Sequence, residues 1–431
     1  MTLPHGFSYT QLTEADKRAL IDLDLWVFPS DIDIDKYMKR PLPVELSRTR
    51  VVTTEDRRFV ACHASYEYQN FPVPGSSVAC GGLTWVGVHP QYRRQGLLRS
   101  MITQHLQDCV DRGEVISTLF AAEPTIYGRF GYGLASYDLR CTIGRGAALR
   151  PLFNDDETAD LTIRIETYSP DEHQQLIEEV HAQGGQNVGG TGLNRPGWAL
   201  RETPGLISYM HSDVDLSTGN EQQRIVIVER SGKPVGFARF RRKTNWENTG
   251  PSGAVNAGEV VALDPAASRK LWSVITDFDL TSTVTAFMIP VDDPIVGLLE
   301  NNRAISMNHV DNVWTRIIDL HKALAQRQYA ADVDVVLEVT DPLLPQNNGR
   351  WRVSAPAFGG ADGTEQATVT ATTDAADISL NVRELGAIYL GGVSLASLAA
   401  SGQVTVHNQQ AGIRASVAFG WPIAPMSSWV F

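Results

Sequence analysis

The sequence predicts a mixed α/β fold of the α+β type, divided among two or three domains. Length is the first reason, because 431 residues are more than one ordinary hydrophobic core can organise. The second is the alternation of short apolar strands, helical periodicity and turn residues along the chain. The third is an unbroken strand, turn and helix between residues 77 and 112, around which we expect the rest of the chain to be organised.

The composition is that of a soluble globular protein, with 43% hydrophobic and 20% charged residues. No apolar run approaches the length of a membrane span, and no basic segment leads into an apolar one at the N-terminus. We therefore expect no membrane partner and no signal peptide. The net charge of −12 argues against general nucleic-acid binding. It suits a cationic substrate, although acidity also serves solubility alone.

The four cysteines, Cys62, Cys80, Cys109 and Cys141, all lie in the first third of the chain, without a CxxC or paired spacing. They are expected to be buried free thiols in a reducing cytoplasm rather than a disulfide framework. None of the ten histidines falls in a zinc-binding pattern, so no metal is expected.

The N-terminal part predicts a helix followed by strands. The helix is expected to begin at Thr13, which can cap a first turn that carries acids, and to stop at Pro29. Strands are expected at 50–53 and 58–62, and the small, apolar stretch 77–84 predicts a buried strand.

The loop Arg93-Arg94-Gln95-Gly96 is the chemically distinctive part of this region. It precedes a helix expected from Leu97 to Arg112, with Gly113 as the C-cap. A helix N-terminus offers free N–H groups and the positive end of a dipole, which bind anions. The glycine lets a ligand approach the backbone, and the arginines add positive charge. The loop therefore suits a pyrophosphate, although it lacks the Lys-Ser/Thr pair of a P-loop. An ordinary strand–helix junction would explain Gly96 but neither the arginines nor Pro90.

This stretch resembles motif A of the GNAT superfamily of N-acetyltransferases, whose pattern is Arg/Gln-x-x-Gly-x-Gly/Ala. The chain has Arg93 and Gly96 but carries Leu98 at the last small position. The resemblance implies that acetyl-CoA is the co-substrate, with its pyrophosphate on the loop and its thioester carbonyl against N–H groups of the preceding strand. The cofactor-binding residues that it implies are Val86, Gly87, Val88, Arg93, Arg94, Gln95, Gly96, Leu97, Leu98, Arg99, Ala122 and Glu123.

A second motif follows a strand expected at 115–120, which the GNAT topology splays from its neighbour to admit pantetheine. The peptide Ile-Tyr-Gly-Arg-Phe-Gly-Tyr-Gly at 126–133 is close to a stretch of the enhanced intracellular survival (Eis) acetyltransferases, a three-domain GNAT family. In that family the first tyrosine, here Tyr127, protonates the departing thiolate. A phenol is an O–H donor of high pKa, which suits this role. The alternative is a tyrosine packed at a helix start with its hydroxyl on a backbone carbonyl.

The segment after the first helix borders the acceptor pocket in a GNAT fold. Here Ser30 to Asp35 contains three aspartates in six residues. Asp31 and Asp33 are therefore candidates to face a cationic acceptor. A solvated acidic loop is the alternative.

A second domain is expected from 160 to 310, after a linker rich in glycine and acids. Within it, the glycine-dense stretch 184–192 is expected to be a flexible loop. The stretch 259–272 echoes the strand, turn and helix of the first domain, with Leu271 where Gly96 stands. A leucine side chain would crowd a diphosphate, so we expect a degenerate GNAT-like domain with a structural role only.

The last part of the chain resembles the sterol-carrier-protein fold, which forms the third domain of Eis proteins. The expected division is thus an active GNAT domain at 1–150, the degenerate copy at 160–310 and this domain at 313–431. This segment is expected to start near 313–319, and its expected elements are strands at 333–339, 350–353, 367–372 and 378–382 and helices at 320–328, 383–390 and 395–400.

The sequence ends in Ser427-Ser428-Trp429-Val430-Phe431, which is more aromatic than a frayed tail. In the Eis family the C-terminal phenylalanine returns to the active domain and its α-carboxylate is the general base, which implies this role for Phe431. A carboxylate with a pKa of about 3.5 is a weak base, but partial desolvation and a close amine allow it to take the proton. A terminus that merely docks in a groove is the alternative.

The resemblance implies direct acetyl transfer from acetyl-CoA to amines of aminoglycoside-like polycations, at one or more positions, and hence antibiotic resistance. It also implies a cytoplasmic homohexamer. One rival is a GNAT enzyme acting on protein lysines or arylalkylamines, which a narrow neutral pocket would favour. The other is a non-enzymatic lipid carrier, against which the intact loop of arginines and glycine speaks.

Overall fold

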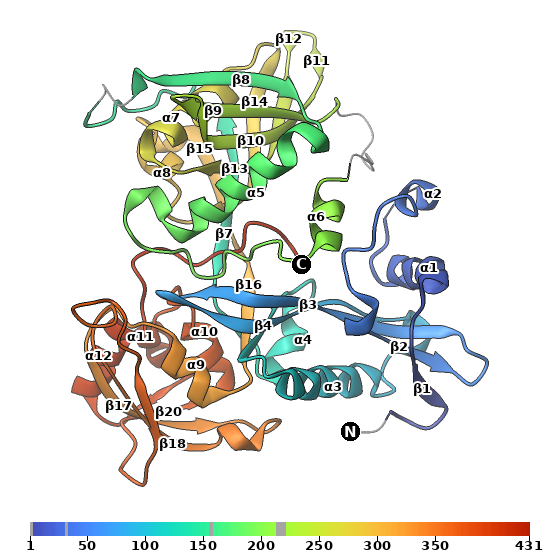
Figure 1. The fold of residues 1–431 in the computed structure, drawn as a ribbon, viewed down its shortest axis with the longest axis vertical. Coiled ribbons are helices and arrows are strands. Elements are labelled where there is room, and N and C mark those ends of the chain that lie inside the picture. The colour runs from blue at the N-terminus through green and yellow to red at the C-terminus, as the bar shows by residue number, and fades with distance from the viewer. Residues whose placement is uncertain (1–2, 31–32, 155–157, 213–220) are drawn as a thin grey trace.

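The computed structural model describes residues 3–30, 33–154, 158–212 and 221–431. It contains two seven-stranded sheets, one above the other in Figure 1, and a five-stranded sheet beside the lower one. The predicted mixture of helices and sheets in a tandem arrangement is confirmed. No helix in the described part of the chain is long and apolar enough to cross a bilayer.

The first sheet has the strand order β1-β2-β3-β4-β5-β16-β6, with one parallel pair, β4–β5. Helix α3 begins after Gly96 and ends at Gly113, as predicted, and packs against the sheet. The strands are β1 (Phe7–Thr10), β2 (Thr49–Thr54), β3 (Phe59–Val73), β4 (Ser76–Val88), β5 (Ile116–Phe120), β6 (Gly133–Leu134) and β16 (Val313–Ile317), and the helices are α1 (Lys17–Val27), α2 (Ile34–Tyr37), α3 (Leu97–Arg112) and α4 (Pro124–Tyr127).

The two parallel strands stay together only briefly. Residues 80–82 of β4 pair with residues 116–118 of β5, and beyond them β4 continues against β3 while β5 continues against β16. Trp85 adopts φ 52°, and the register between β3 and β4 shifts by one residue around it. Such a bulge bends and twists a strand, so it directs the end of β4 away from β5.

The second sheet has the order β15-β7-β14-β13-β10-β9-β8. A small hairpin, β11 (Trp246–Glu247) and β12 (Gly250–Pro251), extends from it. The strands are β7 (Tyr137–Gly144), β8 (Leu161–Thr167), β9 (Arg224–Arg230), β10 (Lys233–Lys243), β13 (Gly253–Ala262), β14 (Thr281–Pro290) and β15 (Ile305–Asp311), and the helices are α5 (Pro170–Gln186), α6 (Pro204–Met210), α7 (Pro265–Ile275) and α8 (Pro294–Leu298).

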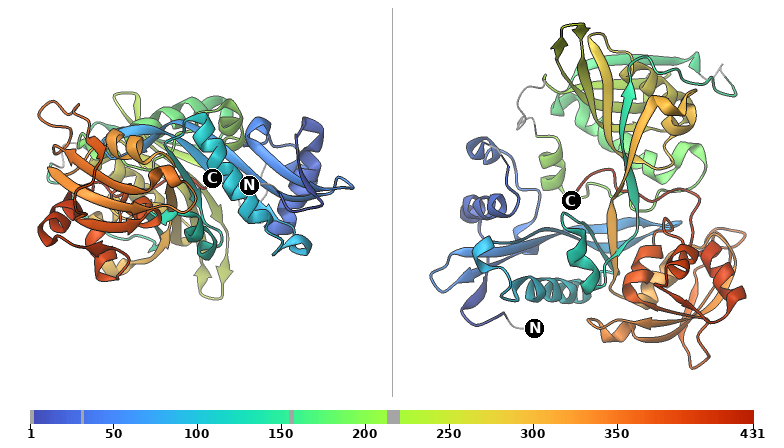
Figure 2. Two further views of the ribbon diagram at one scale, coloured as in Figure 1. Left: turned by 90° about the horizontal axis from the view of Figure 1, so that it is seen from below. Right: turned by 180° about the vertical axis from the view of Figure 1, so that it is seen from behind.

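The two large sheets exchange strands. Strand β7 leaves the first segment of the chain and pairs with β14 and β15 in the second sheet. Strand β16, which follows the second segment, inserts between β5 and β6 of the first sheet. Both crossings are visible from behind in Figure 2. The first two segments are therefore interlocked.

The second domain repeats the strand–helix–strand unit but not its loop. Strands β13 and β14 are parallel and flank α7, as β4 and β5 flank α3. However, α7 begins directly after the strand, and the Asp264 side chain caps it by accepting the N–H of Ala267 at 2.8 Å. Leu271 lies inside this helix, buried, rather than at the place of Gly96. The whole anion-binding loop is missing, and the chain's own carboxylate occupies the helix N-terminus.

The prediction of a flexible loop at 184–192 is wrong for its first residues, because α5 continues through Gln186. The glycines belong to the helix for a packing reason: a Cβ on Gly185 would lie 2.1 Å from the Trp198 ring. A second short helical turn, Val188–Gly190, follows.

The third domain has the strand order β19-β18-β17-β20-β21, with helices packed on the sheet (Figure 1). Its buried side chains belong to a hydrophobic core that continues into the first sheet. The buried Arg327 donates to the carbonyls of Tyr389 and Phe419. The strands are β17 (Val333–Thr340), β18 (Gly349–Ala355), β19 (Thr368–Ala371), β20 (Ile378–Asn381) and β21 (Thr405–Val406), and the helices are α9 (Leu320–Gln326), α10 (Val382–Ile388), α11 (Leu395–Ala400) and α12 (Gln409–Ala418).

Helix α10 of the third domain lies directly on the edge of the first sheet. A Cβ on Gly386 would lie 2.2 Å from the main-chain oxygen of Thr315 in β16. A Cβ on Gly133 in β6 would lie 2.0 Å from the main-chain oxygen of Arg383. Only glycine permits backbones to approach this closely.

We predict that Gly386→Ala lowers the midpoint of thermal unfolding, because the added methyl group has no space, at a cost of roughly 1–3 kcal/mol. Gly297→Ala is the matched control, since Gly297 is also helical and nothing lies within 4 Å of its Cβ position. That change should stabilise by about 0.5 kcal/mol. Equal midpoints for Gly386→Ala and the unchanged chain in differential scanning calorimetry would contradict this close packing.

Candidate active site

A cavity of about 830 Å³ lies where the ends of β4 and β5 separate, below the N-terminus of α3. It is lined by every residue expected to bind the cofactor except Gln95, which is exposed on the loop. The other lining residues are Val27, Phe28, Tyr92, Ile126, Tyr127, Arg129, Phe130 and Leu343.

The loop above this cavity has the backbone of an anion cradle. Arg94 and Gly96 adopt φ 64° and 86°, and Gly96 is the N-cap residue of α3 without a side chain to cap it. The first N–H groups of α3 are therefore available to a ligand, unlike those of α7. The volume and the open helix end fit a coenzyme A pyrophosphate and its pantetheine arm.

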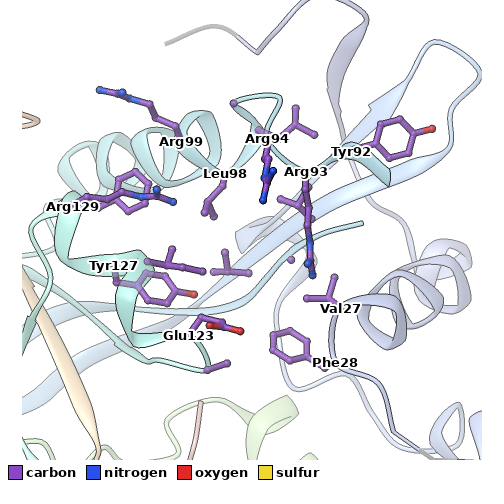
Figure 3. A pocket seen from close by; sticks show the side chains of 18 of the residues that line it. Val27, Phe28, Tyr92, Arg93, Arg94, Leu98, Arg99, Glu123, Tyr127 and Arg129 are labelled. Carbon is purple, nitrogen blue, oxygen red and sulfur yellow. The ribbon is translucent and has the colours of Figure 1, made fainter. Parts of the chain in front are cut away.

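Four arginines line the cavity: Arg93, Arg94, Arg99 and Arg129. Within the described residues, none of them forms an ion pair, so their charges are available to a ligand with several phosphates. Figure 3 shows Arg93, Arg94 and Arg129 directed into the same space, while Arg99 extends outward from α3. Sequence reasoning missed Arg129, although it lies in the quoted peptide beside Tyr127.

A second cavity, of about 450 Å³, meets the first at Tyr127. Residues far apart in the chain form it, including Tyr209 of α6 and the C-terminal segment. The lining residues are Asp24, Phe28, Tyr37, Pro43, Tyr66, Leu83, Thr84, Trp85, Val86, Phe120, Ala121, Ala122, Tyr127, Arg140, Tyr209, Asp311, Trp429, Val430 and Phe431.

Tyr127 is the last residue of α4 and is 7% exposed. Burial raises the pKa of its phenol to about 12, so the hydroxyl is protonated at neutral pH. Figure 3 shows the hydroxyl directed into the cavity. No hydrogen bond to a backbone carbonyl is found for this hydroxyl among the described residues, which is what the packed-tyrosine alternative required.

Phe431 lies inside the second cavity and is 6% exposed. Its ring packs against Tyr68, Phe120 and Trp429, with centroids 5.1–5.4 Å apart. Hydrogen bonds fix the segment before it: Ser427 N–H donates to Asn312 Oδ1 at 2.8 Å, and Trp429 Nε1 donates to the carbonyl of Ala199 at 3.0 Å. The segment is therefore held by the connection between β15 and β16 and by the loop before α6.

The structure describes only one of the two aspartates expected to face the acceptor, Asp31 and Asp33, and does not place it in the second cavity. Asp31 lies outside the described residues. Asp33 caps α2 by accepting the N–H groups of Asp35 and Lys36 and is not among the residues that line the second cavity. The side-chain carboxylates found there are those of Asp24 and Asp311. Burial raises the pKa of Asp24 to about 6.

Sequence reasoning missed Asp24, although a signal exists. It is a polar residue between Leu23 and Leu25 on the apolar helix α1, whose neighbours pack against the sheet. Asp311 could not be found in this way, because it reaches the cavity only through the strand exchange. Asp311 accepts a hydrogen bond from Trp314 Nε1 at 2.9 Å. No group of three or more potential metal ligands gathers anywhere in the described ranges.

Comparisons with known proteins agree with this architecture. Residues 8–135 and 197–317 each match a family described as an acetyltransferase (GNAT) domain, and residues 320–428 match a sterol carrier protein domain. An uncharacterised N-acetyltransferase of Streptomyces avermitilis is 37% identical over 353 residues, 81% of either chain. N-acetyltransferase Eis of Mycobacterium tuberculosis is 28% identical over 378 residues, 85% of either chain. The structure of Eis1 from Mycobacterium abscessus has a TM-score of 0.78 at 26% identity and covers 99% of this chain and 100% of its own.

We predict that Gly96→Ala weakens binding of coenzyme A, because an alanine is strained at φ 86° by about 1–2 kcal/mol and would distort the loop. Gly113→Ala is the matched control, since Gly113 has φ 74° at the other end of the same helix. Both variants should lose similar thermal stability, but only Gly96→Ala should raise the dissociation constant in isothermal titration calorimetry. Unchanged affinity for coenzyme A in Gly96→Ala would show that this loop does not form part of the binding site.

Proposed function

The chain belongs to the Eis-like family of GNAT N-acetyltransferases, and from this premise we propose that it acetylates amino groups of polycationic, aminoglycoside-like acceptors. The observation that supports the proposal is the pair of cavities that meet at Tyr127. One is lined by four arginines and suits an anionic donor. The other is lined by Asp24, Asp311 and the C-terminal Phe431 against one arginine, Arg140, and suits a cationic acceptor.

On the donor side, acetyl-CoA supplies an activated acetyl thioester. The first turn of α3 and the loop arginines bind its pyrophosphate by hydrogen bonds and charge. The end of β4, residues 86–88, is free of β5 on one side and supplies N–H groups to the thioester carbonyl, where negative charge develops during attack. These residues orient the donor, and orientation accounts for much of the acceleration.

On the acceptor side, the amine approaches the thioester from the second cavity. The Phe431 α-carboxylate takes the proton that the amine loses, directly or through one water. The Tyr127 hydroxyl donates its proton to the sulfur as the carbon–sulfur bond breaks. Burial keeps Tyr127 protonated until that moment. The products are the amide and the free thiol, and no metal takes part.

The character of the second cavity supports a polycation. Asp24 on α1 and Asp311 at the end of β15 place carboxylates on different elements around it. Aromatic rings, among them Tyr37 and Tyr66, also line the cavity and can attract ammonium groups. A narrow neutral pocket, which protein lysine or an arylalkylamine would favour, does not fit this lining. The lipid-carrier alternative would leave the arginines and Gly96 that line the first cavity without a role.

Antibiotic resistance and a homohexamer complete the proposal and rest on the same family membership, and a cytoplasmic location rests on the four buried free cysteines. Static light scattering of the purified chain checks the assembly. A hexamer has six times the mass of the 47.3 kDa chain. A monomer in solution would contradict this part of the proposal alone.

The proposed function is tested by thiol release from acetyl-CoA with an aminoglycoside acceptor. We predict rapid turnover by the unchanged chain and a kcat lower by roughly 10²–10⁴-fold in Tyr127→Phe, because the proton donor is lost. One alanine added after Phe431 should cause a comparable loss, because it leaves the ring in place but moves the carboxylate. Tyr137→Phe, in a tyrosine outside both cavities, is the control for an unspecific effect.

Three outcomes would contradict parts of this mechanism. Full activity of the extended chain would show that Phe431 is not the base. Full activity of Tyr127→Phe would show that Tyr127 is not the acid. Preference for a protein lysine or arylalkylamine over all aminoglycosides would replace the proposed acceptor.

We predict that Asp24→Asn raises the KM for polycationic acceptors roughly tenfold at pH 8, because a charge-assisted hydrogen bond is lost. In the unchanged chain this KM should rise as the pH falls through about 6, where Asp24 becomes protonated. Asp24→Asn should lack that rise. Asp22→Asn, on the exposed face of the same helix, is the control. A KM profile identical in all three proteins would exclude Asp24 from acceptor binding.

A further inference from the structure

We propose that the third domain is a working part of the coenzyme site. In this inference Leu343, in the loop Asp341–Leu344, forms one wall of the cavity proposed to bind acetyl-CoA, here called the donor cavity. Through Asp341 and Arg316 the same loop holds the turn that follows Tyr127. The role of Tyr127 as the proton donor is taken from the proposed function, whereas the role of the wall requires only that the donor cavity binds acetyl-CoA.

The wall is the Leu343 side chain. It lies in the third domain by sequence but lines the donor cavity together with residues of α3 and α4. It also packs on the apolar cluster that contains Tyr127, Phe130 and Tyr132, and its neighbour Leu344 is buried in the same cluster. Leu343 therefore offers an apolar surface to the nonpolar part of coenzyme A.

The connection to the turn is Arg316, which is fully buried in β16. Its Nε donates to the carbonyl of Phe130 at 2.9 Å, and one terminal nitrogen donates to Asp341 Oδ1 at 2.7 Å. The turn is shaped around this guanidinium, because a Cβ on Gly131 would lie 2.7 Å from Arg316 Nε. The turn after Tyr127 cannot move without breaking these contacts.

Asp341 extends the connection to the wall. Its side chain is also fully buried, and Oδ1 accepts the N–H groups of Leu343 and Leu344, both at 3.1 Å. The other oxygen accepts Asn347 Nδ2 at 2.9 Å. A continuous chain of hydrogen bonds thus joins the carbonyl of Phe130 to the backbone of Leu343.

A contribution to stability alone does not account for the buried ion pair of Arg316 and Asp341. A buried ion pair carries a large desolvation cost, and apolar residues of similar size often stabilise a protein more. The pair instead fixes an orientation, because the planar guanidinium of Arg316 holds the carbonyl of Phe130 and the carboxylate of Asp341 in one geometry. The guanidinium of Arg383, in α10, lies against the same turn, since a Cβ on Gly128 would lie 3.1 Å from its Cζ.

The wall is tested with Leu343→Ala and Leu343→Asp in the full-length chain. Leu343→Ala should raise the KM for acetyl-CoA roughly fivefold through lost apolar contact, with kcat unchanged. Leu343→Asp should raise it further by repelling the phosphates. Leu398→Ala, a half-buried leucine of α11 in the same domain, is the control and should leave KM unchanged. An unchanged KM for acetyl-CoA in both Leu343 variants, with normal thermal unfolding, would contradict the proposal that Leu343 forms a wall of the donor cavity.

The positioning role is tested with Asp341→Asn and with Arg316→Lys, each alone and combined with Tyr127→Phe. Each single change should lower kcat at least tenfold, and neither should lower it further in Tyr127→Phe, because the loss acts through the tyrosine. Equal losses in both backgrounds would show a merely structural pair and overturn the role. Arg316→Lys, which keeps the buried charge, serves if Asp341→Asn does not fold.

The two proposals fail in distinguishable ways. Full kcat in Tyr127→Phe alone would refute the proposed proton donor and, with it, the positioning role. The Leu343 variants would still test the role of Leu343 in the donor cavity, because their readout is the KM for acetyl-CoA. Full kcat in the Arg316 and Asp341 variants, with low kcat in Tyr127→Phe, would refute only the positioning role.

Discussion

The site depends on the early separation of β4 and β5. Parallel strands normally pair along their length, but here only residues 80–82 and 116–118 do so before the bulge at Trp85 turns β4 aside. The separation frees one edge of β4 and leaves space beneath the N-terminus of α3, while β16 pairs with the opposite edge of β5. Both cavities and the turn with Tyr127 lie around this opening.

The two cavities at this opening differ in the charged residues that line them. The chain as a whole carries a net charge of −12, yet the donor cavity is lined by four arginines. The acceptor cavity is lined by two aspartates, one of which has its pKa raised to about 6 by burial. In the proposed function, local positive charge in an acidic molecule attracts the anionic donor to one cavity, and the carboxylates of the other bind the cationic acceptor.

Local features of the sequence predicted much of this arrangement. The helix from Leu97 to Arg112 and the loop before it were predictable, because glycine caps and helical periodicity act over a few residues. The parts that depend on long-range contacts were not. Leu343 and Asp311 reach the site only through tertiary packing, and the expected alignment of Leu271 with Gly96 is wrong because a loop was lost, not one residue. Gly185 suggested flexibility but provides space for Trp198.

The exchange of β7 and β16 also constrains synthesis on the ribosome. Strand β16 completes the first sheet, yet it begins only at Val313, after the whole second sheet has been translated. Until then the nascent chain exposes the edge of β5, and an unpaired edge can bind other strands. N-terminal folding in step with translation must therefore stop short of a finished domain. The same linkage makes the tandem pair hard to shuffle as separate genetic modules.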